Sequence, residues 1–152
     1  MTTEIDGVMR SVGDSISRNL FRDGSGAIGR VNNSSFGTTA LDLVTDMDSL
    51  NFEVGMVLQL ASAKSGGSVR SGTLEVSAVN RGATSSQITL TGNISAGVSA
   101  VAQNDYIYQA GDYDSALTGL EGWLPATAPG ATAFFGQDRT ADVSRLAGQR
   151  YD

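Results

Sequence analysis

The spacing of apolar residues changes near residue 38, and this change limits the folds open to the chain. In the first twenty residues, apolar side chains recur at helical spacing and would form one stripe along a helix: Ile5, Val8, Met9, Val12, Ile16 and Leu20. From about residue 38 to about residue 110, apolar residues alternate with polar or small ones, as on strands with one buried face. The pattern predicts an α+β chain that begins with an amphipathic helix.

The alternating runs are short, and turn-forming residues separate them. The longest run places its apolar residues on one predicted strand face: Phe52, Val54, Met56, Leu58 and Leu60. Glycine, asparagine and serine cluster between the runs, as at residues 65–68 and 80–83. Five or six such strands predict a small antiparallel β-barrel or sandwich over residues 38–112.

Three glycines follow the predicted helix. Gly24, Gly26 and Gly29 have the G-x-G-x-x-G spacing of a dinucleotide-binding loop. That loop joins a strand to a helix, whereas here a helix comes first and an extended segment follows. We interpret the glycines as a helix-ending turn and expect no cofactor.

Composition narrows the chemistry further. The chain has no cysteine and no histidine, which excludes catalytic triads with histidine, thiolate nucleophiles and histidine- or thiolate-ligated metals. A formal net charge of −6 with one lysine argues against duplex DNA as a ligand, because binding it normally requires a basic face. Asp105, Asp112 and Asp114 are the best candidates for a carboxylate metal cluster, but surface solvation explains them equally well. We therefore predict no metal site and no catalytic residues.

The C-terminal segment, residues 113–152, is predicted to be mostly irregular. A short helix is expected where Leu117, Leu120, Trp123 and Leu124 precede Pro125. The only tryptophan is expected to anchor packing, in an internal core or at an interface. The candidate interaction or packing residues are Trp123, Leu124, Phe134, Phe135, Arg139 and Arg145.

Three groups of segments resemble the major capsid proteins of tailed bacteriophages and prophages, which have the Hong-Kong-97-like coat fold. The first is IDGVMRSVG at residues 5–13 with NLFRDGSG at 19–26. The second is FEVGMVL at residues 52–58. The third is GLEGWLP at 119–125, FFGQDR at 134–139 and RLAG at 145–148. Together they cover roughly a third of the chain.

The resemblance implies a structural virion protein without enzymatic activity. Residues 1–37 would be the helix and glycine-rich turn of the coat-protein core, 38–112 an inserted β-domain, and 113–152 the return to that core. The partners would be copies of the chain in hexamers and pentamers, with no membrane, no small-molecule substrate and no specific nucleic-acid sequence. Assembly would take place in the bacterial cytoplasm and yield the icosahedral shell around the genome. The chain would be a central fragment, with the stripe of its first helix packed inside the subunit.

Two other functions remain open. One is a different virion β-module, such as a decoration, tail or receptor-binding domain, which a solvent-facing aromatic patch on the β-domain would favour. The other is an acid-pair hydrolase, which needs two carboxylates about 5–10 Å apart in a cleft.

Overall fold

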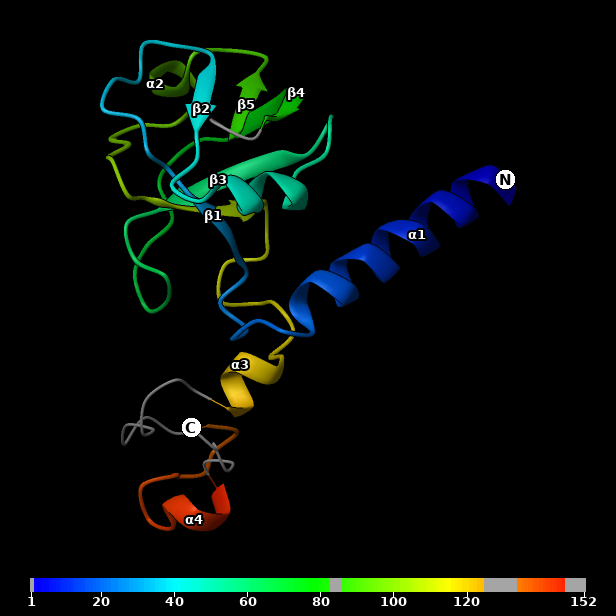
Figure 1. Cartoon of the computed structure of the whole chain (residues 1–152), viewed down its shortest axis with the longest axis vertical. Coiled ribbons are helices and arrows are strands. Elements are labelled where there is room, and N and C mark those ends of the chain that lie inside the picture. The colour runs from blue at the N-terminus through cyan, green and yellow to red at the C-terminus, as the bar shows by residue number, and fades with distance from the viewer. Residues whose placement is uncertain (1, 83–85, 125–133, 147–152) are drawn as a thin grey trace. The chain divides into compact units, whose positions relative to one another are not determined.

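The computed structural model describes residues 2–82, 86–124 and 134–146, and the chain divides into two compact units (Figure 1). The β unit is Ser25–Ser115. The helical unit combines Met1–Gly24 with Ala116–Asp152. In sequence order the β unit therefore interrupts the helical unit.

Six antiparallel strands form the sheet of the β unit, in the order β1-β6-β3-β4-β5-β2. The strands are β1 (Ala27–Arg30), β2 (Ala40–Asp42), β3 (Val57–Ala61), β4 (Leu74–Arg81), β5 (Ser86–Leu90) and β6 (Tyr106–Gln109). The 3₁₀-helix η1 (Asp46–Asn51) connects β2 to β3, and α2 (Ile94–Gly97) lies between β5 and β6 in sequence. The predicted α+β class and antiparallel sheet are confirmed.

The sheet is not a closed barrel, so that part of the prediction is wrong. The edge strands β1 and β2 are four and three residues long. Just past their ends, Val31 and Leu43 form one isolated bridge, flanked by hydrogen bonds from Asn32 N to the Asp42 oxygen and from Val44 N to the Arg30 oxygen. Strands this short cannot extend the bridge into a ladder that would close the sheet.

The core of the β unit is built from alternate strand positions. Leu58 and Leu60 on β3 are fully buried, and Ile88 and Leu90 on β5 meet the same cluster. The expected strand face from Phe52 to Leu60 is only partly correct, because Val54 is 68% exposed. A turn at 53–55, with Gly55 at φ +86°, delays the start of β3 until Val57 and breaks the alternation.

An ion pair with a buried carboxylate holds two loops of the β unit together. Asp105, 3% exposed, accepts hydrogen bonds from Arg70 Nε at 2.7 Å and Nη2 at 2.8 Å. Its Oδ2 also accepts the backbone N–H of Ala102 at 2.9 Å. The hydrogen bond to Asp105 raises the pKa of Arg70, against the opposing effect of burial. The pair therefore ties the loop after β3 to the loop before β6.

The helical unit contains α1 (Thr2–Asn19), α3 (Leu120–Trp123) and α4 (Val143–Leu146). The first confirms the helix predicted from residues 5–20, and α3 falls where a short helix was expected. Within the described ranges, no helix has the length and apolar character that crossing a bilayer requires.

Candidate interaction surface

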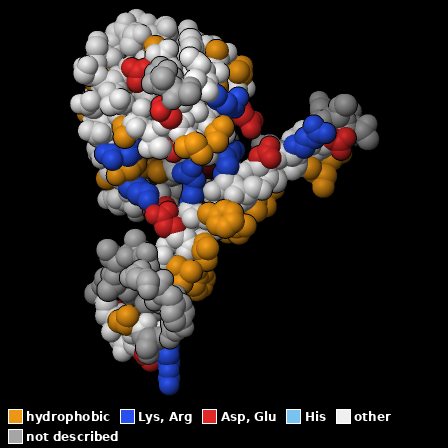
Figure 2. All heavy atoms as spheres, in the orientation of Figure 1, with side chains coloured by type: hydrophobic (Ala, Val, Ile, Leu, Met, Phe, Trp, Pro, Cys, Tyr) orange, Lys and Arg blue, Asp and Glu red, His pale blue; other side chains and the backbone are white. Residues whose placement is uncertain are grey.

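The apolar stripe of α1 is exposed. Ile5, Val8, Met9, Val12 and Ile16 are each 51–69% exposed, whereas the resemblance implied that they pack inside the subunit. In Figure 2, hydrophobic side chains line one side of this helix. Arg10 and Asp14 are four residues apart, as are Asp14 and Arg18, so opposite charges recur along the polar face.

The C-terminal end of α1 packs closely against the segment that leads into α3. Leu120 N donates a 2.7 Å hydrogen bond to the Leu20 oxygen. A Cβ at Gly119 would collide with the carbonyl oxygens of Asn19 and Leu20, so only glycine permits this approach. The contact fixes residues 118–123 beside the end of the helix.

This junction forms an apolar hollow of about 360 Å³. Its lining residues are Leu20, Phe21, Thr118, Gly119, Leu120 and Trp123. The large side chains among them are about half to two-thirds exposed, between 49% for Leu120 and 67% for Phe21. The hollow is therefore open to solvent and accessible to another apolar group.

Three aromatic rings pack together beside the hollow, and we call them the aromatic cluster: Trp123, Phe134 and Phe135. The Trp123 ring stacks on Phe135, with centroids 5.4 Å apart, and meets Phe134 edge to face at 4.9 Å. The two phenylalanine rings are edge to face at 4.7 Å. Trp123 and Phe135 remain 52% and 69% exposed, so the cluster is part of the surface rather than a closed core.

Arg139 contacts both the aromatic cluster and the backbone of α3. Its guanidinium carbon lies 4.0 Å from the centroid of the Phe134 ring. Its Nη1 donates to the carbonyl oxygens of Gly122 at 3.0 Å and Trp123 at 3.5 Å. Its Nε is buried without a hydrogen-bond partner among the described residues. Arg139 thus positions the two sides of the cluster.

A tight turn presents the Phe135 ring to solvent. Phe134 and Gln137 exchange backbone hydrogen bonds of 2.9 and 3.0 Å. Between them, Phe135 has φ +50° and Gly136 has φ +78°, which corresponds to a type I′ turn. Glycine, asparagine and aspartate are the residues that favour these positions, so an exposed phenylalanine here is unusual.

The structure brings four of the six predicted interaction residues together: Trp123, Phe134, Phe135 and Arg139. Leu124 follows α3, is 38% exposed and donates its N–H to the Leu120 oxygen at 2.8 Å. Arg145 lies on α4, where its Nε is 3.5 Å from Asp142 Oδ2 and its side chain is 85% exposed. An exposed pair of this kind contributes little to stability.

The sequence pattern placed Leu20 on the helical stripe and Leu120 in the short helix, but neither of them, nor Phe21, was predicted to be an interaction residue, and all three line the hollow. A signal was available, because Leu20 and Phe21 prolong the apolar stripe just past the end of α1. Leu117, Leu120 and Trp123 also recur at spacings of three. The pattern did not reveal that Leu20 and Phe21 lie beside Leu120 and Trp123 in the folded chain.

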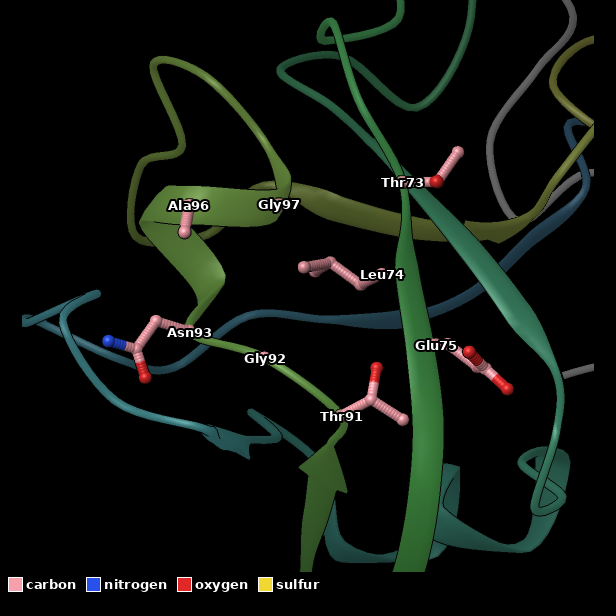
Figure 3. Close-up of a pocket in the computed structure, with 8 residues that line it drawn as sticks. All are labelled: Thr73, Leu74, Glu75, Thr91, Gly92, Asn93, Ala96 and Gly97. Carbon is pink, nitrogen blue, oxygen red and sulfur yellow. The ribbon is translucent and has the colours of Figure 1, made fainter.

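A second hollow, of about 250 Å³, lies in the β unit between β4 and the segment that enters α2 (Figure 3). Leu74 points into it, while Glu75 extends from the opposite side of β4. Glu75 supplies the single carboxylate among its lining residues, whereas acid-pair hydrolysis requires two. Among the described residues, no group of three acidic side chains is arranged to hold a metal ion.

No protein-family model matches the chain, and no curated protein or solved structure matches it either.

Proposed function

We propose that this chain is a structural virion subunit, a fragment of a phage or prophage major capsid protein that associates with copies of itself. The observation that carries the proposal is the exposed apolar surface of the helical unit. It comprises the stripe of α1, the hollow and the aromatic cluster. The resemblance in residues 5–26 and 119–148 covers the same parts of the chain.

The size of this surface supports association with a protein partner. More than ten large apolar side chains of the helical unit are exposed, most by about half or more. With roughly 150 Å² of accessible area for each large side chain, the ten exposed ones in the stripe, the hollow and the aromatic cluster leave on the order of 800 Å² uncovered. Taken over these three features, that area is comparable to the about 800 Å² per partner that a standard interface buries.

Composition favours the same function. The chain contains a single lysine and 19 glycines. Long flexible side chains lose conformational freedom when an interface orders them, so a surface with few lysines is less costly to bury. The exposed leucine, valine and aromatic side chains of the helical unit lose less conformational entropy when they are buried.

The decoration or receptor-binding alternative has less support. The described aromatic residues of the β unit are Phe36, Phe52, Tyr106, Tyr108 and Tyr113, and each is buried or partly buried. The exposed aromatic patch that this alternative needs lies in the helical unit instead.

Sedimentation velocity and negative-stain electron microscopy of the full chain test the proposal. We expect oligomers that grow with protein concentration, and more strongly at higher salt because each copy carries a net charge of −6. A monomer at all concentrations between about 1 and 100 µM would contradict self-association. The flanking coding sequence is an independent test, since a capsid fragment should continue in frame beside portal and protease genes.

A further inference from the structure

Two apolar features of the helical unit have opposite shapes. The stripe of α1 is convex, a single row on a rod about 27 Å long. The hollow lies at the C-terminal end of α1. It is concave, and its large apolar lining residues are Leu20, Phe21, Leu120 and Trp123. Both are exposed in the same chain.

The hollow has room for side chains of the stripe. Its volume is about 360 Å³ and it is open to solvent, so apolar side chains can enter it from outside. Two neighbouring stripe residues, such as Val8 and Val12, lie one helical turn apart and would enter together. Apolar side chains of a helix entering an apolar groove are an established mode of recognition.

The geometry points to a head-to-tail contact in which the stripe of α1 from one copy occupies the hollow of a second copy. This inference rests on the proposed function and names its interface. A contact between two different patches forms rings or filaments, and every copy then buries both its stripe and its hollow. Pairing two stripes face to face would leave both hollows open.

The charges of α1 favour a protein partner over a lipid surface. Asp6, Arg10, Asp14 and Arg18 balance one another, Glu4 adds one more negative charge, and the whole chain is acidic. Helices that lie on anionic membranes carry an excess of lysine and arginine on their polar face. This helix lacks that excess.

Two variants block the two sides separately. Val12→Asp places a charge on the stripe, where Val12 is 52% exposed, and leaves the hollow intact. Leu120→Asp places a charge in the hollow, at the first residue of α3, where an acid suits the helix N-terminus. Ser17→Asp on exposed α1 surface and Leu117→Asp, 54% exposed and outside the hollow, are the matched controls.

We expect each blocking variant alone to weaken self-association by at least about 30-fold, the loss typical of a hot-spot residue, while the controls stay within about threefold. An equimolar mixture of the two blocking variants should form 1:1 heterodimers and nothing larger. In that pair, the intact stripe of the Leu120→Asp chain occupies the intact hollow of the Val12→Asp chain. The stripe and the hollow left over both carry a charge, so no third chain can add. Sedimentation velocity distinguishes these species.

Trp123 is the only tryptophan and lines the hollow, so its emission reports occupancy. We expect a blue shift as wild-type concentration rises, and in the mixture, but not in either blocking variant alone. The chain has no cysteine, so Val12→Cys and Leu120→Cys chains provide a second readout. Mixed under oxidising conditions, they should give predominantly the heterodimer.

The outcomes separate this inference from the proposed function. Suppose that the wild-type chain associates. If the blocking variants then associate equally well, or if their mixture stays monomeric, the head-to-tail contact is wrong while the proposed function stands. Predominant Val12→Cys homodimers would indicate stripe-to-stripe pairing and also overturn the head-to-tail contact. A wild-type chain that stays monomeric at all concentrations tested would contradict both the head-to-tail contact and the proposed self-association.

Discussion

The backbone N–H of Asp114 donates a 3.0 Å hydrogen bond to the carbonyl oxygen of Ser25, so the two ends of the β unit meet. Beside this bond, Gly26 has φ +82°, and a Cβ there would collide with the carbonyl oxygen of Asp112. A segment whose ends are adjacent can interrupt another unit with little displacement of the flanking chain. The strand pairing of β1 with β6 closes the same end of the β unit.

The first prediction is that residues 25–115 fold without the rest of the chain. The sheet, the main hydrophobic cluster and the Arg70–Asp105 pair all lie within this segment. We expect cooperative thermal unfolding and dispersed amide NMR signals from the isolated segment. A shorter segment, residues 38–112, omits β1 and should fail to unfold cooperatively. Equal behaviour of the two segments would contradict the role assigned to β1.

The second prediction concerns Gly26. Replacement by alanine forces an L residue into the left-handed region and against the Asp112 carbonyl, so the free energy of unfolding should fall by about 2 kcal/mol or more. Gly37→Ala is the control, because nothing lies within 4 Å of a Cβ there. The control should change stability by less than about 1 kcal/mol in urea titrations. Similar losses in both variants would contradict the close approach at Gly26.

The third prediction concerns the Arg70–Asp105 ion pair. Asp105→Ala leaves Arg70, which is 21% exposed, and the Ala102 N–H without their acceptor, so we expect a loss of about 2 kcal/mol in the free energy of unfolding. Arg145→Ala, which removes an exposed pair, should cost about 0.5 kcal/mol or less. Chemical denaturation followed by circular dichroism measures both. A loss at Asp105 as small as that at Arg145 would show that the pair is not important for stability.

The fourth prediction concerns Asp138, just after the Phe134–Gln137 turn. Hydrogen bonds from the Thr140 hydroxyl at 2.6 Å and backbone N–H at 2.8 Å lower the pKa of Asp138. Because the pKa is lowered on folding, the stabilisation is present above the ordinary value and is lost as pH falls through the lowered one. Thr140→Val removes the hydroxyl donor, so an NMR titration of the Asp138 carboxyl carbon should show a higher pKa. An unchanged pKa would contradict this assignment.

The sequence pattern was most informative where one face of an element is buried by its own unit. Alternation located strands such as β5, because Ile88 and Leu90 face the core. It missed β1, since Ala27, Ile28, Gly29 and Arg30 resemble a loop and their order comes from pairing with β6, distant in the sequence. It could not decide barrel closure, which depends on the lengths of the edge strands.

The pattern was less informative for the interaction surface. A helical stripe shows that α1 has an apolar face, but periodicity does not say whether that face is covered by the same chain. Trp123 could be selected from its size alone. Its contacts with Phe134 and Phe135 depend on a positive-φ turn, which a phenylalanine at position 135 does not suggest.

The last prediction uses that turn to separate stability from association. Phe135→Asn relieves the left-handed strain, about 1 kcal/mol, and loses ring contacts with Trp123 and Phe134 worth about 1 kcal/mol each. The free energy of unfolding should therefore fall by about 1 kcal/mol. Self-association should weaken by about tenfold, because a ring 69% exposed in the monomer is removed from the apolar surface. Gln137→Ala, in the same turn and also exposed, is the control and should alter neither quantity. A large loss of stability with unchanged association would instead assign Phe135 to internal packing.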